Sequence, residues 1–599
     1  MQKKNDILLI FPPVWITDLP FLSTPTLLAF LKKNNIDAEQ IDLNAEFWKY
    51  LYSYSFVSEI YENLKDKFYK IEQQIHKTEQ DSLLLKKIAV FAQMSLEQFV
   101  YEIQEKIISQ NIYIELMGIF SDFKNSEKDI NEYHDVLFSK ISLSNYATSV
   151  EKITNIVYSD HNPYKTFLNP LIDDILSKTN NIVGISITSI SQVVAAFTIA
   201  HLIKVNNPDC KIVIGGSWCS LLGKELGNKL NDFPFIDYLI VNEGEIPLLN
   251  LINTLKAKKE QGIKGVYCKI KGQIVYIPSN ESISLSQIPV ADFTGFDMNF
   301  YSEKHTLPIQ SSRGCYWGKC IFCSFPILES KYKTKDVELI VEEIKYLQNK
   351  YGTKTFNFVD SLMSPSFAEK FSNLIIKNNI DIEWIILARF EPNFSEALLS
   401  RMKESGCSTI CWGLESANQR ILEVINKNIN LKDAESILYN ATKLKIHNRV
   451  LVMYGLPTEK YDEAYDTILF LRKNINYIQS LSYSLYHPEK NTPIECFCKE
   501  NKIELSIKLE DNLTFSYFWG GNMEGRAINK ISDEYNKLDN YINNSLYSVS
   551  HGVFFVYDDN RGLIKYDLVS NSTKIQIVSY IIEKSNHLER IFYEITQVQ

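Results

Sequence analysis

Two series of alternating strand and helix patterns constrain the fold of this 599-residue chain more than any other feature. In the first series, residues 181–260, apolar runs such as Ile182–Thr188 and Lys211–Ile214 alternate with segments of helical periodicity. Such alternation is typical of a parallel sheet with helices on both faces, so a doubly wound, Rossmann-type α/β domain is predicted. Residues 1–45 read as strand, helix and strand, and we assign them to the same domain.

A long helical segment separates these two parts of the predicted domain. Between Pro25 and Pro163 there is no proline and only one glycine, and apolar residues recur at helical spacing. Because proline and glycine punctuate most connections, their scarcity favours continuous helices. Residues 46–176 are therefore expected to be a helical insertion into a domain that extends over 1–265. The segment 266–305 is expected to link this domain to the next.

The second series contains six strand patterns, separated by helical ones, between residues 306 and 498. Consecutive units of this kind predict a (β/α)6 barrel or partial barrel, whose active site lies at the carboxyl ends of the strands. The six strands are expected at Leu307–Ser312, Lys354–Val359, Trp384–Ala388, Thr409–Leu414, Arg449–Tyr454 and Ser480–Leu485. Residues 499–599 are expected to form a small α+β region, with a hairpin at Val553–Tyr557 and Leu563–Tyr566, and are a candidate for binding substrate.

Composition and charge exclude several classes of protein. Apolar residues make up 45% of the chain and no run approaches the length of a spanning helix, so we expect no membrane association. The formal net charge of -9 argues against nucleic-acid binding. The first residues lack a signal peptide's apolar core, and ten cysteines are too few and too unevenly spread for a disulfide framework. A cytoplasmic location is therefore expected.

Small and polar residues follow the predicted strands of the first domain. In doubly wound sheets ligands bind beyond the carboxyl ends of the strands, and small residues let a large ligand approach the backbone. Ordinary turn formation is the competing explanation. The residues concerned are Ser186, Thr188, Ser189, Gly215, Gly216, Ser217, Glu243 and Gly244.

The strongest chemical signal is a group of three cysteines directly after the first barrel strand. Cys315, Cys320 and Cys323 lie within nine residues of one another. A loop this short can bring three thiolates to one metal centre, and three ligands leave one iron of a four-iron cluster open for chemistry. Structural zinc is the rival, but it needs a fourth ligand, and no cysteine or histidine pair follows at finger-like spacing.

The cysteine loop and several strand-end motifs resemble those of the radical S-adenosylmethionine enzymes. That family usually separates its cysteines by three residues and then two, whereas this chain has four and then two. Further matches end the second to fifth strands in order: Asp360, Arg389, Gly413–Asn418 and Tyr454–Glu459. Together with residues 1–45 and 181–260, the layout is similar to the cobalamin-binding branch of the family.

The resemblance implies that the three cysteines hold a [4Fe-4S] cluster whose open iron binds S-adenosylmethionine, which is cleaved to a 5′-deoxyadenosyl radical. It also implies an electron donor such as a flavodoxin or ferredoxin. Around S-adenosylmethionine it implies contacts from Phe322, Asp360, Arg389, Glu415, Ser416 and Gly455. Phe322 would pack near the adenine and Arg389 would pair with a carboxylate. Cys411, on the inner side of the fourth strand, is either core filling or a donor of a hydrogen atom.

The resemblance further implies cobalamin above the strand ends of the first domain. The Asp-x-His-x-x-Gly signature that supplies a histidine to cobalt is absent, so the cofactor is expected base-off with no protein histidine on the metal. The eight strand-end residues Ser186, Thr188, Ser189, Gly215, Gly216, Ser217, Glu243 and Gly244 would form its bed. A retained but empty fold is the alternative.

These inferences predict a cobalamin-dependent radical enzyme, in the simplest version a methyltransferase, that methylates or otherwise remodels an unactivated carbon of a peptide or natural product. One alternative is a radical enzyme that matures a ribosomal peptide, for example by epimerisation, with a vestigial cobalamin domain. Another is a non-catalytic, metal-bound scaffold or sensor. The sequence carries no signature of a particular substrate.

Overall fold

A computed structural model describes most of the chain. The described residues are 4–74, 76–104, 116–117, 143–179, 181–259, 261–279, 281–301, 305–328, 331–506, 512–514, 516–517, 525–546, 552–558, 562–567 and 596–597. The chain divides into two compact units. The larger contains Met1–Ala45 and Ser144–Asn544, and the smaller contains Glu46–Leu143 and Ser545–Gln599.

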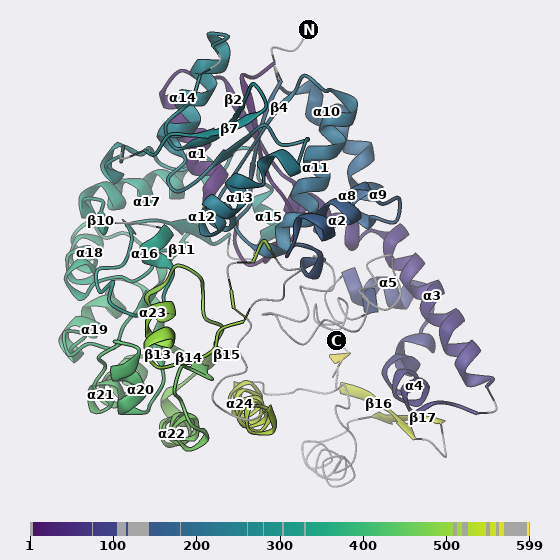
Figure 1. The fold of residues 1–599 in the computed structure, drawn as a ribbon. Helices are drawn as coiled ribbons and strands as arrows, with labels where there is room; N and C mark the ends of the chain where they lie inside the picture. Colours follow the sequence, from purple (N-terminus) through teal and green to yellow (C-terminus); the bar gives the residue numbers. More distant parts are fainter. Residues whose placement is uncertain are drawn as a thin grey trace. The chain divides into compact units, whose positions relative to one another are not determined.

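Seven strands form the first sheet of the larger unit, in the order β2-β1-β3-β4-β5-β6-β7 (Figure 1). They are β1 (Ile7–Phe11), β2 (Ala38–Asp42), β3 (Ile182–Ser186), β4 (Lys211–Gly215), β5 (Tyr238–Ile240), β6 (Val266–Ile270) and β7 (Gln273–Tyr276). The first five are parallel, and β1 lies between β2 and β3, which makes the gap between β1 and β3 the topological switch point. The predicted doubly wound α/β domain is confirmed.

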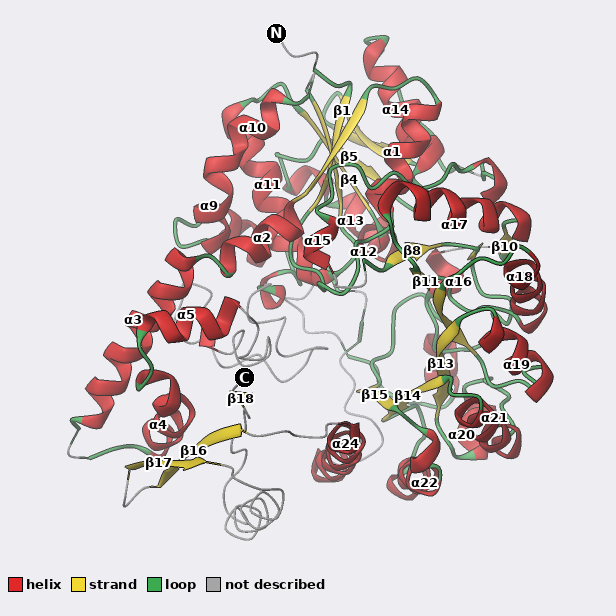
Figure 2. Cartoon of the chain, turned by 180° about the vertical axis from the view of Figure 1, so that it is seen from behind, coloured by secondary structure: helices red, strands yellow, loops and turns green. Residues whose placement is uncertain are grey.

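Helices cover both faces of this sheet (Figure 2). On one face, α1 (Ser23–Lys33) and α14 (Glu245–Lys256) pack their apolar side chains against the strands. On the other lies α11 (Val193–Asn206), whose residues are nearly all buried because α8 (Val150–Tyr158), α9 (Pro163–Leu168) and α10 (Ile172–Ser177) contact it as well. A helix that is apolar all round is typical of such an interior position.

The prediction that residues 266–305 only link the two domains is partly wrong. Val266–Ile270 and Gln273–Tyr276 pair antiparallel with β5 and with each other, and so they complete the first sheet. Farther along, Phe293 and Tyr301 are buried in the core beside the second sheet. These residues carry ladder hydrogen bonds and apolar packing that a free connection lacks.

Six parallel strands form the second sheet, in the order β15-β14-β13-β12-β11-β8. They are β8 (Leu307–Ile309), β11 (Thr355–Phe358), β12 (Glu383–Ala388), β13 (Cys407–Glu415), β14 (His447–Tyr454) and β15 (Ser480–Leu485). The helices between them are α17 (Val337–Tyr351), α18 (Pro365–Lys377), α19 (Glu396–Glu404), α20 (Gln419–Val424), α21 (Leu431–Lys443) and α22 (Tyr461–Lys473). All six predicted strands are confirmed, as a partial barrel of βα units.

The remaining elements of the larger unit are short connections, apart from one long helix near its end. Helical ones are α12 (Ser217–Leu222), α13 (Lys224–Asn228), α15 (Met298–Tyr301), α16 (Phe325–Leu328), α23 (Pro493–Glu500) and α24 (Gly525–Leu546). A two-stranded pair joins β9 (Ser312–Arg313) to β10 (Lys333–Thr334). Single 3-10 turns occur at η2 (Ser144–Tyr146), η3 (Asn169–Leu171), η4 (Ile190–Gln192), η5 (Leu230–Asp232), η6 (Leu285–Gln287) and η7 (Ile475–Tyr477).

The smaller unit is helical in its first part. The helix α2 (Leu43–Leu51) leads into it, followed by α3 (Tyr54–Glu72), α4 (Glu79–Ala92) and α5 (Leu96–Gln104). Tyr61 joins these helices, because its ring packs 5.4 Å from that of Phe99 and its hydroxyl donates to the carbonyl of Met94. In its second part β16 (Gly552–Asp558) pairs antiparallel with β17 (Gly562–Asp567) and with β18 (Thr596–Gln597), which confirms the predicted hairpin.

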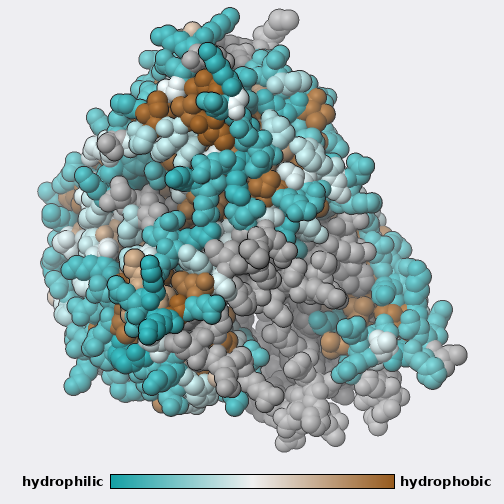
Figure 3. All heavy atoms as spheres, in the orientation of Figure 1, coloured by the Kyte–Doolittle hydropathy of each residue, from teal (hydrophilic) through white to brown (hydrophobic). Residues whose placement is uncertain are grey.

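The described surface is predominantly hydrophilic on the face drawn in Figure 3, where hydrophobic residues form separate patches. Among the residues that the structure describes, no helix combines the length and the apolar character that crossing a membrane demands.

Candidate functional site

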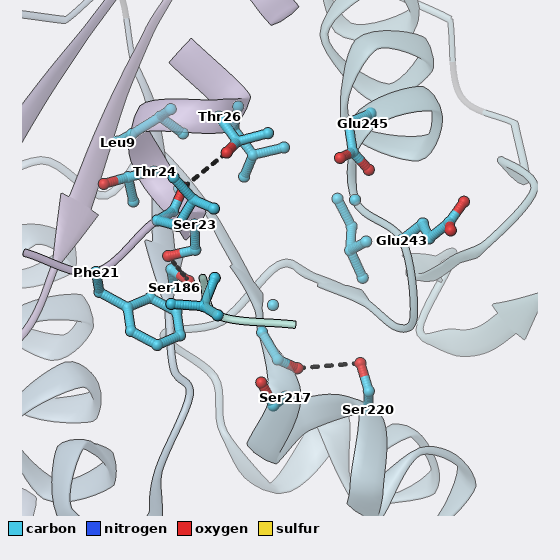
Figure 4. Close-up of a pocket in the computed structure, with 18 of the residues that line it drawn as sticks. Leu9, Phe21, Ser23, Thr24, Thr26, Ser186, Ser217, Ser220, Glu243 and Glu245 are labelled. Carbon is cyan, nitrogen blue, oxygen red and sulfur yellow. Dashed lines mark hydrogen bonds between the residues drawn. The ribbon is translucent and has the colours of Figure 1, made fainter. Parts of the chain in front are cut away.

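The carboxyl ends of β1, β3, β4 and β5 border a cavity of about 480 Å³ (Figure 4). Backbone and side chains of the first sheet form its floor, and the loop that follows β1 contributes a wall. Residues in or directly after two strands of the second sheet also line it: Pro308, Gln310, Asn357 and Val359. The cavity therefore lies where both sheets present the ends of their strands, the position at which α/β sheets bind ligands.

Six of the eight strand-end residues predicted to form a ligand bed line this cavity: Ser186, Gly215, Gly216, Ser217, Glu243 and Gly244. Thr188 and Ser189 are not among the lining residues. The backbone N–H and hydroxyl of Thr188 both donate to Gln192 Oε1 at 2.8 Å, and the Ser189 hydroxyl accepts from Ser191 N. These two residues build the turn before α11, the explanation that competed with ligand binding.

A wall of the cavity comes from residues 15–27, which the sequence did not indicate. Phe21 stacks on Phe11 with ring centroids 5.4 Å apart, and the Ser186 hydroxyl donates to Ser23 Oγ at 2.9 Å. Thr24 Oγ1 is buried and has no hydrogen-bond partner among the described residues. A buried hydroxyl without a partner is uncommon, so it marks a place where a ligand's polar group fits. The available signal was an aromatic-rich loop directly after a strand's carboxyl end.

Charged side chains join the cavity to the cysteine loop. Arg313, which lines the cavity two residues before Cys315, donates to Glu245 Oε1 at 2.5 Å and to Gln310 Oε1 at 3.1 Å. Lys333 donates to Glu243 Oε1 at 2.5 Å. The Arg313 and Glu245 side chains are only 11% and 4% exposed, so each needs the other to offset its loss of hydration.

Asp360 fixes the start of the cysteine loop. Its Oδ1 accepts from the backbone N–H groups of Ser311 and Ser312 at 2.8 and 2.7 Å, and the Ser311 hydroxyl donates to Oδ2. Burial raises the pKa of Asp360 to about 6, although these hydrogen bonds act in the opposite direction. The carboxyl therefore holds the strand end from which the loop departs.

The three cysteines of the loop are half-buried and lie near one another. Burial raises the pKa of Cys323 to about 12, and the Cys320 and Cys315 thiols beside it add to the rise. Gly314 adopts a φ of +77°, where a Cβ would lie 3.1 Å from the carbonyl of Lys331, so the loop needs glycine there. Within the described part of the chain, no three His, Cys, Asp or Glu side chains converge as ligands of a single metal ion.

Three thiols spread over one loop are a donor set that suits an iron–sulfur cluster, because each thiolate then binds a different iron. The raised pKa values of the Cys320 and Cys323 thiols mean that iron must displace their protons when it binds. A buried cation, the Lys427 ammonium, also lies beside the cysteine loop. Lys427 Nζ is buried near Cys320 and pairs with Glu415 Oε1 at 2.9 Å. Burial lowers the pKa of Lys427, but Glu415 and Cys320 raise it further, so the ammonium stays charged.

Arg389 contacts the cysteine loop through the ring of Trp317. Its guanidinium carbon lies 3.8 Å from the ring centroid of Trp317. It donates to the carbonyls of Lys427 at 2.8 and 3.0 Å and of Asn428 at 2.6 Å, and it pairs with Glu391 at 2.8 Å. Its planar fork thus ties the cysteine loop to the segment after the fourth barrel strand. No sequence pattern indicated Lys427 or Asn428.

Glu415 is aimed by an irregularity in β13. The pairing register shifts between Gly413 and Glu415, and Glu415 has a φ of +67°. A bulge of this kind redirects a side chain, and backbone strain is common at functional sites. Glu415 Oε1 and Lys427 Nζ consequently lie over Gly413, at 2.7 and 3.0 Å from where a Cβ would stand.

The other residues predicted around S-adenosylmethionine lie at the same end of the sheet. Ser416 is fully buried, and its hydroxyl accepts from Asn418 N. Gly455 N donates to Glu459 Oε2 at 2.7 Å, and Phe322 packs edge-on against Tyr486. Cys411 is half-buried farther down β13.

The model of the radical SAM superfamily matches residues 309–471. The chain is 31% identical over 336 residues to an uncharacterized methyltransferase, PH0819, of Pyrococcus horikoshii, which covers 55% of this chain and 71% of that protein. It is 24% identical over 305 residues to the anaerobic magnesium-protoporphyrin IX monomethyl ester cyclase of Cereibacter sphaeroides. This match covers 48% of this chain and 48% of that protein, so the chain spans about half of that relative's length.

Among solved structures, the chain is similar to OxsB, a cobalamin-dependent S-adenosylmethionine radical enzyme with aqua-cobalamin bound. The TM-score is 0.59, the match covers 97% of this chain and 71% of that one, and the identity is 14%. At this identity the likeness concerns the fold: an α/β domain of Rossmann type beside a radical SAM partial barrel.

Proposed function

Because the chain belongs to the radical S-adenosylmethionine superfamily, we propose that it is a cobalamin-dependent member that methylates, or otherwise remodels, an unactivated carbon of a peptide or natural product. Membership makes the protein an enzyme and implies a [4Fe-4S] cluster and S-adenosylmethionine. The use of cobalamin, the kind of substrate and the roles of individual residues are the proposed part.

One observation carries the cobalamin part of the proposal: both ends of the cysteine loop line the cavity of the first sheet. Arg313 stands two residues before Cys315, Phe325 stands two residues after Cys323, and both are lining residues. A ligand in the cavity would therefore border the loop. The cavity is mostly apolar, and Ile16, Phe325 and Val359 on its lining are unusually exposed for large apolar side chains. Such a lining suits a broad, largely apolar cofactor.

When bound, the cofactors supply one-electron cleavage of S-adenosylmethionine and a methyl group for transfer. The chain's own residues would hold and orient them. Cys315, Cys320 and Cys323 would ligate the cluster, and the Lys427 ammonium would offset negative charge beside Cys320. We assign contacts with S-adenosylmethionine to three groups at the mouth of the barrel: Phe322, Glu415 and Gly455.

Three further residues of the predicted set would position that site rather than touch the ligand. Asp360 holds the loop's first residues, Ser416 is enclosed in the turn after β13, and Arg389 spends its donors on Lys427, Asn428 and Glu391. Ser186, Gly215, Gly216, Ser217, Glu243 and Gly244 would line the cobalamin bed, with Thr24 Oγ1 as a further donor. Among the described residues that line this bed none is a histidine, so we assign no side chain of the lining to cobalt.

The proposal is tested by following the products of S-adenosylmethionine. The protein, reconstituted with iron, sulfide and hydroxocobalamin and then reduced, is expected to release 5′-deoxyadenosine and S-adenosylhomocysteine. Changing Cys315, Cys320 and Cys323 to alanine should abolish 5′-deoxyadenosine, whereas C496A, at an exposed cysteine outside the loop, should not. A reconstituted wild type that releases neither product contradicts the proposal.

Retention of cobalamin separates the proposal from its alternative. Hydroxocobalamin should remain with the protein through gel filtration at about one per chain. A ratio near zero, with 5′-deoxyadenosine still formed, would replace the proposal by a radical enzyme without cobalamin, for which incorporation of solvent deuterium into a peptide is the diagnostic product.

A further inference from the structure

The inner face of the second sheet is only partly covered. Along β12 and β14 the side chains alternate between full burial against the helices and partial exposure on the opposite side. The half-buried residues of this inner face include Ile385, Leu387, Cys411, Leu451 and Met453. Parallel sheets are normally covered on both faces. On this face the described side chains keep part of their surface exposed, which makes them candidates for contact with a bound molecule.

Arg449 projects from β14 onto this inner face. Its neighbour Asn448 is fully buried on the helix side, where it donates to the carbonyl of Leu438 and accepts from Trp412 Nε1 at 2.8 Å. Alternation along the strand therefore directs Arg449 inward. There its Nε and Nη2 donate to Ser482 Oγ at 3.0 and 2.8 Å, and the side chain remains exposed.

Arg449 differs from the other arginines of the barrel region in its lack of an acidic partner. Within the described residues no carboxylate lies at ion-pair distance from it, whereas the other arginines between residues 306 and 500 each pair with a glutamate. Those pairs are Arg313–Glu245, Arg389–Glu391, Arg401–Glu369, Arg420–Glu463 and Arg472–Glu534. A guanidinium carries five N–H groups. Among the described residues Ser482 accepts two of them, which leaves three for another acceptor.

The strand register shows how far along the barrel this guanidinium lies from the cysteine loop. Ser482 lies opposite Leu451, which lies opposite Gly413. Gly413 is the residue over which Glu415 and Lys427 meet, next to the cysteine loop. Arg449 itself lies opposite Cys411, but its guanidinium is bonded to Ser482, which is level with that pair and two strands from it. Two strand spacings correspond to about 10 Å. A small molecule can span this distance.

We propose that Arg449, held by Ser482, binds an oxyanion of the substrate, either a carboxylate or a phosphate, and thereby fixes which carbon faces the cysteine loop. This inference rests on the proposed function and adds the chemical class of the substrate to it. Guanidinium groups bind carboxylate and phosphate through paired, charge-assisted hydrogen bonds, and the serine fixes the plane of the fork beforehand. The half-covered apolar residues around it would contact the rest of the substrate.

Cys411 gives the proposal a reporter that needs neither cofactor nor substrate. It lies directly opposite Arg449 in the strand register. In the full-length protein, iodoacetate should label Cys411 faster, relative to neutral iodoacetamide, than it labels the exposed Cys496, by about fivefold from the local positive charge. Peptide mass spectrometry reads both sites in one sample. Inorganic phosphate should protect Cys411 from iodoacetate, and potassium chloride at equal ionic strength should not.

Variants decide whether Arg449 is the cause. R449M should abolish both the preference for iodoacetate and the protection by phosphate, and R449K should keep part of each. R472M is the matched control, because Arg472 is a barrel arginine that already pairs with Glu534. An unchanged preference in R449M, or an equal loss in R472M, overturns the proposal.

A binding measurement distinguishes a substrate subsite from a site for the carboxylate of S-adenosylmethionine. Equilibrium dialysis of S-adenosylmethionine on the reconstituted protein should give the same dissociation constant for wild type and R449M. A tenfold weaker affinity in R449M would assign the arginine to S-adenosylmethionine and overturn the proposal. The labelling results do not depend on cleavage of S-adenosylmethionine, so a wild type that cleaves none would contradict the proposed function and leave the anion site to be judged by the labelling alone.

Discussion

The two parallel sheets of the larger unit end their strands in different ways. The first sheet ends in serines and glycines around a cavity of about 480 Å³. The second ends in buried ionisable groups, Asp360, Arg389 and Glu459. Asp360 and Arg389 are bonded to backbone groups of neighbouring loops, and Glu459 to backbone N–H groups of its own loop. The same architecture thus provides space at one site and a rigid frame at the other.

The difference follows from what each residue type does at a strand end. Small side chains leave room and let a ligand reach the backbone. Buried charges are costly unless they are paired and hydrogen-bonded, so they remain only where they fix a loop in place. We therefore expect substitutions in the second sheet to act on the fold of the cysteine loop. Most of those in the first should act on ligand binding.

The largest effect is expected for R389M. The change leaves the carbonyls of Lys427 and Asn428 without their guanidinium donor and removes the ion pair of Glu391, which keeps its hydrogen bond from the Tyr316 hydroxyl. It should lower the free energy of unfolding by about 3 kcal/mol. Denaturant unfolding of the cofactor-free protein measures it. The control is R401M, at a half-exposed pair with Glu369, where the cost should stay below about 1 kcal/mol. An equal decrease in the free energy of unfolding in both variants would show that the buried bonds of Arg389 stabilise the fold no more than an exposed ion pair does.

Gly216 lies at a strand end of the first sheet where the backbone leaves no space for a side chain. Its φ is +107°, and a Cβ would stand 2.3 Å from the carbonyl oxygen of Ile187. G216A should therefore cost about 2 kcal/mol of stability and release cobalamin. At Gly244 a Cβ would lie 3.6 Å from Leu27 Cδ2, an ordinary contact, so G244A should change stability by less than about 0.5 kcal/mol. Equal free energies of unfolding for G216A and G244A would show that Gly216 is not a conformationally restricted position.

Glu459 gives the second sheet a pH dependence. Burial raises its pKa to about 7, although Gly455 N and Leu456 N donate to Oε2 and act against the rise. The reference value for an unfolded glutamate is about 4.3, so between these pH values the folded chain binds more protons and this group's stabilisation is lost as pH rises. Glutamine cannot ionise, and its oxygen can accept the same two N–H groups.

We therefore expect E459Q to gain stability relative to the wild type between pH 5 and pH 8, by about 2 kcal/mol. Urea unfolding at the two pH values measures this difference. A constant gap between the two proteins would mean that the carboxyl titrates normally.

The smallest effects are expected within the first sheet, where they separate turn residues from lining residues. T188V removes a hydroxyl that donates to Gln192, so it should cost about 1 kcal/mol of stability without changing cobalamin retention. S186A removes a hydroxyl that lines the cavity, so cobalamin should dissociate faster while stability changes by less than about 1 kcal/mol. The opposite assignment of effects would move Thr188 back into the bed.

The sequence predicted the features that depend on local patterns. The six barrel strands are apolar runs of the right length, and the three cysteines lie so close together in the chain that their loop brings them near one another. Turn residues and cavity-lining residues are of the same types, so the sequence pattern alone does not separate Thr188 from Ser186. Arg389 was expected to meet a ligand carboxylate, and its bonds to Lys427 and Asn428 depend on the path of a loop that no pattern specifies.

Residues that act through tertiary pairing were missed for the same reason. Lys427 lies in the connection between α20 and α21, and only the tertiary fold brings it near Cys320. Arg449 was seen as part of a strand, and its lack of an acidic partner is visible only once the neighbouring strands are aligned. A short antiparallel edge has little apolar pattern of its own, so the sequence predicts a linker where β6 and β7 lie.

The central claim is that one loop beside an open α/β cavity carries a redox cluster on three thiolates. Its most direct test is the metal and cofactor content of protein purified without oxygen. We expect about four iron and four sulfide per chain with one cobalamin. We expect a variant without Cys315, Cys320 and Cys323 to lose the iron and keep the cobalamin. Iron that persists in that variant, or a single zinc in place of iron in the wild type, would contradict it.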